Sequence, residues 1–241
     1  MSERFADHDP AAGTDTAGVP WQGRTLTGTG FDADDGAIDP KLSSALAERG
    51  DEDALVAAVA QARIMVPIVA IPGQGASTDM ASVTISAPDG TKALVAFSST
   101  TSMSAWDTSA RPVPVSAQRA ALAAVQEGCD VIVIDVGSTD PVTLRSSMVW
   151  ALAMDRAWQP AHIDPQVRAA IDDACSGETS ITARELTLGP AGELIVTLAV
   201  VPGLDADRVQ SAVRALAERI ATDGETRSRI DAIRFRITQA P

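Results

Sequence analysis

The chain has 241 residues, of which 45% are apolar, 21% charged and only 3% aromatic, and its formal net charge is −13 at pH 7. A chain of this length and composition can bury one large core or two modest ones. The negative charge disfavours binding to nucleic acids or anionic lipid, since affinity for both comes largely from Lys and Arg.

The first residues contain no apolar signal segment, and no apolar run approaches the length needed to cross a bilayer. We therefore expect a soluble, cytoplasmic protein that does not engage a membrane. Its two cysteines, Cys129 and Cys175, could form one disulfide, but that would require an oxidising compartment. Cys129 directly precedes a very apolar segment and is expected to be a small buried residue.

Residues 1–38 differ in composition from the rest, with seven acids against two bases and only isolated apolar residues. Such a segment cannot bury enough apolar surface to offset its ordering entropy, so we predict a disordered acidic tail. Trp21, Leu26 and Phe31 are spaced apolar anchors within it. Two interpretations stay open: the tail rests loosely on its own domain, or it docks as a short linear segment on a partner or on the body.

An ordered α/β domain is predicted over residues 39–154, beginning with one or two short helices. The apolar run 64–71 predicts a strand, and Pro67 within it lacks a backbone donor, which favours an edge strand or a bulge. Segments 81–87 and 93–97 flank the turn Pro-Asp-Gly and predict a β-hairpin.

Five further elements complete this predicted domain, each with a local reason. The residue before each proline is pushed into extended geometry, Ser116 is a suitable helix cap, and a run that is apolar on both faces predicts a central buried strand. In chain order these elements are a short helix or turn over 101–106, an extended segment over 111–115, a helix over 117–127, a strand over 131–134 and a helix over about 142–151.

Two prolines, Pro160 and Pro165, interrupt the segment 155–167, and we predict a linker over residues 155–164. Beyond it, residues 165–241 predict a smaller domain in the order helix (about 165–175), hairpin (strands 181–188 and 193–201), helix (206–221) and strand (233–237). The predicted fold class is therefore α/β of α+β-like character, with two small mixed-sheet domains, each with a β-hairpin, a helix and a further strand. Their likeness leaves open whether they are duplicates, because no residue-level repeat is visible.

Several segments are informative through their order along the chain. They are WQGR (21–24), ARIMVPIVA (62–70), APDGTKALVAF (87–97), WDTSARPVPV (106–115), EGCDVIVIDV (127–136) and LRSSMVWALAMDRAW (144–158). In this order they resemble the SseB family, specifically its N-terminal domain as it occurs in actinobacteria. The C-terminal segments PGLDADRVQSAV and RIDAIRF resemble the same family's second region. The resemblance implies no reaction, cofactor or catalytic residue that could be transferred to this chain.

Residues for nucleophilic or metal chemistry are scarce. Of the two histidines, His8 lies in the predicted tail and His162 lies in the predicted linker beside Asp164. A pair of Cys175 and His162 could arise only through folding, and two Cys and two His without short spacing do not build a zinc site. We predict no catalytic residue, no cofactor and no metal.

Asp135 is the best-placed acid, because it follows the buried strand 131–134 and ligands often bind at the carboxyl ends of parallel strands. The competing and favoured interpretation is a loop acid that caps the following turn. The Gly-Gln-Gly at 73–75 follows a strand but lacks the rest of a phosphate-binding motif, so segment 73–79 is interpreted as a mobile loop.

Tryptophan, methionine and arginine near the end of the first predicted domain have the composition of a binding surface. Trp150 and Trp158 would lie close to one face if their helix continued through residue 156. An alternative is that they seal the domain junction. The candidate partner-binding residues are Trp106, Arg111, Trp150 and Trp158.

The sequence thus favours a non-catalytic protein-interaction or regulatory protein with an unidentified protein partner, and a homo-oligomer stays open. The alternative is a small-molecule-binding sensor or cryptic enzyme with a site at the strand ends near Asp135.

Overall fold

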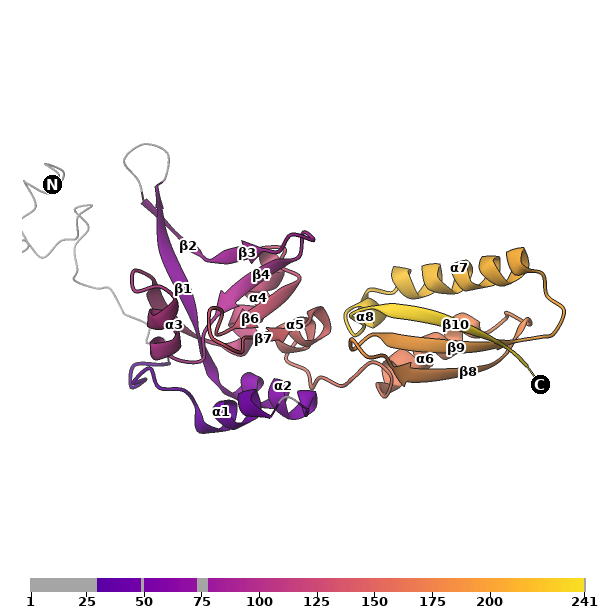
Figure 1. Cartoon of the computed structure of the whole chain (residues 1–241), viewed down its shortest axis with the longest axis horizontal. Coiled ribbons are helices and arrows are strands. Elements are labelled where there is room, and N and C mark those ends of the chain that lie inside the picture. Colours follow the sequence, from indigo (N-terminus) through magenta and orange to yellow (C-terminus); the bar gives the residue numbers. More distant parts are fainter. Residues whose placement is uncertain (1–29, 49, 73–77, 241) are drawn as a thin grey trace, which may run out of the picture. The chain divides into compact units, whose positions relative to one another are not determined.

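The computed structural model describes residues 30–48, 50–72 and 78–240 (Figure 1). Contacts divide the chain into one unit of Met1–Asp34 and a second of Asp35–Pro241. The described part contains eight α-helices and ten strands, which form three small antiparallel or mixed sheets. The α/β, α+β-like fold class expected from the sequence is confirmed.

The first twelve elements of the second unit comprise two of the sheets, ordered β2-β1-β5 and β3-β4-β6-β7, together with five helices. A bridge between Met65 and Phe97 links these sheets, with both backbone hydrogen bonds at 2.8 Å. The elements are α1 (Pro40–Ala47), α2 (Glu52–Gln61), β1 (Arg63–Pro72), β2 (Thr78–Ser82), β3 (Thr84–Ser86), β4 (Lys92–Ala96), α3 (Thr100–Trp106), β5 (Arg111–Ser116), α4 (Ala117–Gln126), β6 (Val131–Ile134), β7 (Val142–Leu144) and α5 (Ser146–Ala153).

Pro67 lies in an internal strand, so the expectation of an edge strand is wrong. β1 is flanked by β2 and β5, and Pro67 faces Pro112 of β5. On its other side the Pro67 carbonyl accepts the Val83 N–H at 3.3 Å, while the Val83 carbonyl accepts from Val95 of β4 at 3.1 Å. Pro67 has no N–H to donate to Val83. At Val83 the segment that paired with β1 as β2 therefore separates from β1 and continues as β3, which pairs with β4.

Strand alternation separates two cores. Leu94 and Ala96 of β4 face a main core that includes buried residues of α1, α2, α4 and α5. Val95 of β4, together with Phe97, faces a minor core that includes Met103 of α3. Residues of α3 and residues of α5 therefore belong to opposite faces of the strands between them.

The last elements form a mixed sheet, ordered β10-β9-β8, with β8 antiparallel and β10 parallel to β9. Leu186, Val196 and Leu198 face a core shared with α6 and α7. Residues 224–227 form a short helix that the sequence did not indicate. These elements are α6 (Pro165–Cys175), β8 (Ile181–Leu188), β9 (Leu194–Val200), α7 (Ala206–Thr222), α8 (Gly224–Arg227) and β10 (Ile233–Gln239).

Two boundaries differ from the sequence-based expectation. The helix expected over about 142–151 is a strand, β7, followed by α5, because Val142–Leu144 pairs with β6. Of the tail expected over 1–38, residues 1–29 lie outside the described residues, and its last residues are packed: Gly36 is buried, the Ala37 carbonyl accepts from Arg63, and Ile38 packs against the main core. Residues 36–38 are held by contacts with distant residues, which composition does not encode.

The two sheets that contain β4 and β9 share a strand arrangement. In each, a hairpin (β3-β4 or β8-β9) is followed by a helix-containing connection to a third strand, β6 or β10, which pairs parallel to the hairpin's second strand. The predicted order of hairpin, helix and further strand therefore occurs twice. Duplication, and the division into domains at residues 154 and 165, stay predictions.

Gly36 and Gly90 provide a matched test of the ordered segment before α1. Both have positive φ, 80° and 91°, but a Cβ on Gly36 would overlap the Thr100 side chain, whereas one on Gly90 would meet nothing within 4 Å. We expect Gly90→Ala to lower the free energy of unfolding by about 1–2 kcal/mol through backbone strain alone, and Gly36→Ala by about 2–4 kcal/mol. Urea unfolding measures both; equal losses would contradict packing of Gly36 on α3.

Candidate partner-binding site

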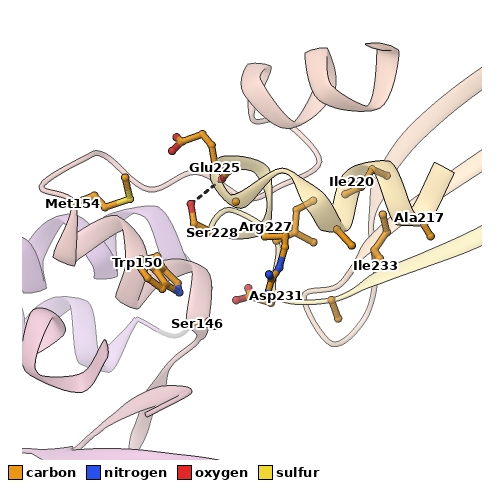
Figure 2. Close-up of a pocket in the computed structure, with 14 residues that line it drawn as sticks. Ser146, Trp150, Met154, Ala217, Ile220, Glu225, Arg227, Ser228, Asp231 and Ile233 are labelled. Atoms are coloured by element: carbon orange, nitrogen blue, oxygen red, sulfur yellow. Dashed lines mark hydrogen bonds between the residues drawn. The ribbon is translucent and has the colours of Figure 1, made fainter. Parts of the chain in front are cut away.

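A pocket of about 660 Å³ lies between α5, α7, α8 and the segment that leads into β10 (Figure 2). Trp150 and Met154 line it from α5, and Ile220 and Ile233 line it from α7 and β10. Trp150 is 38% exposed and Met154 48% exposed. The remaining lining residues are Ser146, Ala217, Ala221, Gly224, Glu225, Arg227, Ser228, Ile230, Asp231 and Ala232.

Helical periodicity places Trp150 and Met154 in the pocket. Met148, Val149 and Leu152 of α5 are buried in the main core, which leaves Trp150 facing away from that core. Met154 is four residues further on and caps the C-terminus of the helix, so the two side chains lie on one side. The helix ends there because Asp155 has a positive φ of 51°.

Two of the three charged residues in the pocket lining are already paired. Glu225 accepts from Arg229, with an ion-pair distance of 2.6 Å. Asp231 accepts from Arg145, with an ion-pair distance of 2.9 Å. The guanidinium of Arg227 is exposed and makes no hydrogen bond or ion pair within the part of the chain that the structure describes.

Asp231 also caps α5 across a long sequence separation. The N-cap position of α5 is Arg145, whose side chain makes no capping bond. Instead the Ser147 N–H donates to Asp231 Oδ1 at 2.7 Å, and the Ser147 hydroxyl donates to Asp231 Oδ2 at 2.9 Å. A carboxylate at a helix N-terminus satisfies free N–H groups and favours the helix dipole, so α5 takes its cap from the segment before β10.

Arg145 extends this arrangement into a junction network, which we define as Glu52, Arg145, Ser147, Trp158 and Asp231. The guanidinium donates to both Glu52 oxygens and to Asp231. Hydrogen bonds to Glu52, and then to Asp231, raise the pKa of Arg145 above its ordinary value although burial opposes this. Trp158 Nε1 donates to the Ser147 hydroxyl at 2.9 Å, and the guanidinium carbon lies 5.7 Å from the Trp158 ring centroid.

The structure does not bring the four predicted partner-binding residues into one surface. Trp158 is only 7% exposed, and α5 ends at Ala153, so Trp150 and Trp158 do not share a helix face. Trp106 is half-buried on the minor core, with its ring centroid 5.3 Å from that of Phe97. Arg111 is exposed at the start of β5.

Trp106 and Trp150 lie over opposite faces of the strands, because their helices belong to different cores. The expectation of one surface containing Trp106, Arg111 and Trp150 is therefore corrected. Composition groups residues by their proximity in sequence, whereas strand alternation separates them in space.

Asp135 serves the fold at the end of β6. It has a positive φ of 57°, its Oδ1 accepts the Ser98 N–H at 2.9 Å, and its carbonyl accepts the Ser138 N–H at 3.1 Å. This geometry agrees with a loop acid that secures a turn and the end of a neighbouring strand. Of the predicted loop 73–79, residues 73–77 lie outside the described residues, and Thr78 and Asp79 begin β2.

The cysteines and His162 lie apart from the pocket lining. Cys129 and Cys175 are free thiols buried in the main core and the α6–α7 core respectively. Burial raises the pKa of both thiols, which keeps them protonated and poorly nucleophilic at neutral pH. The Nδ1 of His162 is buried and has no hydrogen-bond partner among the described residues.

Within the described residues, no group of three or more His, Cys, Asp or Glu is arranged to hold a metal ion. No helix among them combines the length and the apolar character that crossing a membrane requires.

Comparison with known families identifies the first part of the ordered chain. Residues 39–151 match the family model of the SseB protein N-terminal domain, which supports the resemblance seen in the sequence. The match runs from the N-cap of α1 into α5 and therefore includes Trp150. Comparisons with curated proteins and with solved structures find no match.

Proposed function

We propose, with the SseB-type N-terminal domain at residues 39–151 as the premise, that this chain is a non-catalytic protein-interaction or regulatory protein of the SseB family. We further propose that it acts in the cytoplasm and that its C-terminal segments form the family's second region. The observation that carries the function is the exposure of Trp150 and Met154, 38% and 48%, side by side at one pocket. Exposed clustered apolar side chains mark interaction sites.

The chemistry around these side chains supports binding. The acids in the lining, Glu225 and Asp231, are each paired with an arginine, so they stabilise the walls of the pocket. Tryptophan supplies large contact area, and methionine adapts to irregular partner surfaces. Together these features fit a partner side chain packed against α5.

The proposed surface is narrower than the one expected from the sequence. Trp150 is its anchor, and Trp158 supports it from the interior through Ser147. Trp106, half-buried on the minor core, and Arg111, exposed at the start of β5, stay separate candidate contacts outside this surface.

Affinity purification from the native cell tests this function. We expect wild-type protein to recover a stoichiometric protein partner and Trp150→Ala to reduce its affinity at least about tenfold, because anchor residues of an interface contribute more than 1.4 kcal/mol to binding. The affinity is measured with the purified partner and purified protein. Far-UV circular dichroism checks that Trp150→Ala is folded.

Two variants control for general loss of apolar or charged surface. Leu122→Ala removes another apolar side chain, 43% exposed on α4, and Arg119→Ala removes an exposed charge from the same helix; both should bind the partner like wild type. Equal binding by Trp150→Ala would remove Trp150 as the anchor. Failure of wild type to recover any stoichiometric partner would overturn the interaction function.

A further inference from the structure

The charges that line the pocket next to Trp150 restrict the chemistry of the ligand that the pocket can bind. Its apolar walls come from α5, α7 and β10, and the carboxylates of Glu225 and Asp231 are neutralised by Arg229 and Arg145. Arg227 is left as the lining charge without a counter-charge among the described residues. An apolar recess beside an unpaired cation complements a ligand with an apolar group beside an anion.

We propose that this pocket binds a partner polypeptide segment in which an apolar side chain neighbours a carboxylate. The apolar side chain packs between Trp150, Ile220 and Ile233, and the neighbouring Asp or Glu pairs with Arg227. The inference rests on the proposed function and deepens it, since it names the chemistry of the partner.

A partner segment with Lys or Arg beside its apolar side chain, in place of Asp or Glu, would bind less tightly. Both acids that could receive it already accept hydrogen bonds from arginines, and Asp231 also accepts from Ser147. Redirecting either carboxylate would leave its present donors unpaired, which costs binding energy. A carboxylate, by contrast, meets Arg227 without breaking any bond among the described residues.

A polypeptide suits the pocket better than a small free anion. The walls offer Trp150 and Met154 on the one exposed side of α5, and such side chains anchor protein segments. The volume of about 660 Å³ lies within the range of about 300–1,000 Å³ in which ligand groups are buried. The net charge of −13 repels free anions at long range, so the carboxylate must arrive attached to a group with its own affinity.

A synthetic peptide array provides the test, with Leu, Ile, Phe or Met flanked by Asp, Lys or Ser, and fluorescence anisotropy gives affinities for the best peptides. We expect Asp-flanked peptides to bind the full-length wild-type protein about tenfold more tightly than matched Lys-flanked peptides, as for a hydrogen bond between charged groups. Arg227→Glu should invert this preference, and Trp150→Ala should weaken both classes.

Arg214→Glu is the matched control, because Arg214 is an exposed arginine of α7 that does not line the pocket and the substitution changes the net charge equally. It should keep the wild-type preference. No array binding, equal affinities for Asp- and Lys-flanked peptides, or an unchanged preference in Arg227→Glu would overturn the inference.

Two other occupants would also overturn it. Sodium octanoate bound by wild type but not by Arg227→Glu, with no peptide binding, would identify a small amphiphilic anion. Sedimentation showing a dimer that Trp150→Ala dissociates would identify a second copy of this chain. If a cellular partner still depends on Trp150 while the charge preference is absent, only the inference fails and the proposed function stands.

Discussion

Replacing Trp158 with alanine should lower the free energy of unfolding by about 3–5 kcal/mol, the usual cost of deleting a buried aromatic side chain. Trp158 is 7% exposed, packs within the main core and donates its Nε1–H to Ser147. The truncation leaves a cavity, and it also removes the hydrogen bond that the Trp158 Nε1–H donates to the Ser147 hydroxyl oxygen. Guanidinium unfolding followed by far-UV circular dichroism measures the loss without relying on tryptophan fluorescence.

Two further variants separate the loss of the buried ring from the loss of its hydrogen bond and from the loss of a tryptophan in general. Trp158→Phe keeps most of the ring and should cost only about 1–2 kcal/mol, mainly through the lost hydrogen bond. Trp150→Ala removes the same side chain from a position 38% exposed and should cost about 1–2 kcal/mol, since only part of the side chain is buried. If Trp158→Ala were as mild as Trp150→Ala, the structural role of Trp158 would be refuted.

These two tryptophans illustrate what composition can and cannot predict. The sequence grouped Trp150 and Trp158 as partner-binding residues because both lie near Met and Arg. The structure buries one and exposes the other, since α5 ends at Ala153 and the chain then turns at Asp155. Burial depends on where a helix ends, and a helix end set by a left-handed residue other than glycine has no strong sequence signal.

Elements with a strong apolar period were predicted well. The alternation in β9 and the apolar stripe of α7 gave those elements within about a residue of their observed ends. β6 was recognised as a central strand because it is apolar on both faces, and it lies between β4 and β7. In these cases local pattern and tertiary environment agree.

Prediction failed where distant residues decide the conformation. Val142–Leu144 has a short apolar pattern that fits a helix as well as a strand, and its pairing with β6 selects the strand. Pro67 suggested an edge strand, yet β1 lies between β2 and β5. The proline is tolerated there because β2 pairs only with Ile68–Pro72, so no ladder bond needs a Pro67 N–H on that side. Neither pairing can be read from the local sequence.

Only part of the candidate site was predicted from the sequence. Trp150 was found through its composition, but Arg227 was not singled out, because its importance comes from the pairing of Glu225 and Asp231 with other arginines. Asp231 was missed because it lies 84 residues from Ser147. One local signal existed: α5 begins after Arg145, which is a poor N-cap residue, so an external cap could have been sought.

Substitution of Asp231 by alanine should lower the free energy of unfolding by about 2–3 kcal/mol, through loss of a helix cap and of a largely buried charge pair. The Asp231 side chain is 16% exposed and that of Arg145 24% exposed, so solvent replaces the lost bonds only in part. Arg145 keeps Glu52, which limits the loss. Urea unfolding gives the size of the effect, and hydrogen exchange at the Ser147 amide reports directly on the missing cap.

Asp231→Asn and Asp173→Ala separate the cap from a general loss of charge. The asparagine retains an oxygen that can accept from Ser147, so it should restore about 1 kcal/mol of the loss. Asp173 is exposed on α6, and its alanine variant should stay within about 0.5 kcal/mol of wild type. Unchanged exchange at Ser147 in Asp231→Ala would contradict the cap. If the cap holds, loosening α5 from this remote acid should also weaken binding at Trp150, since the helix that Asp231 secures is the wall that presents it.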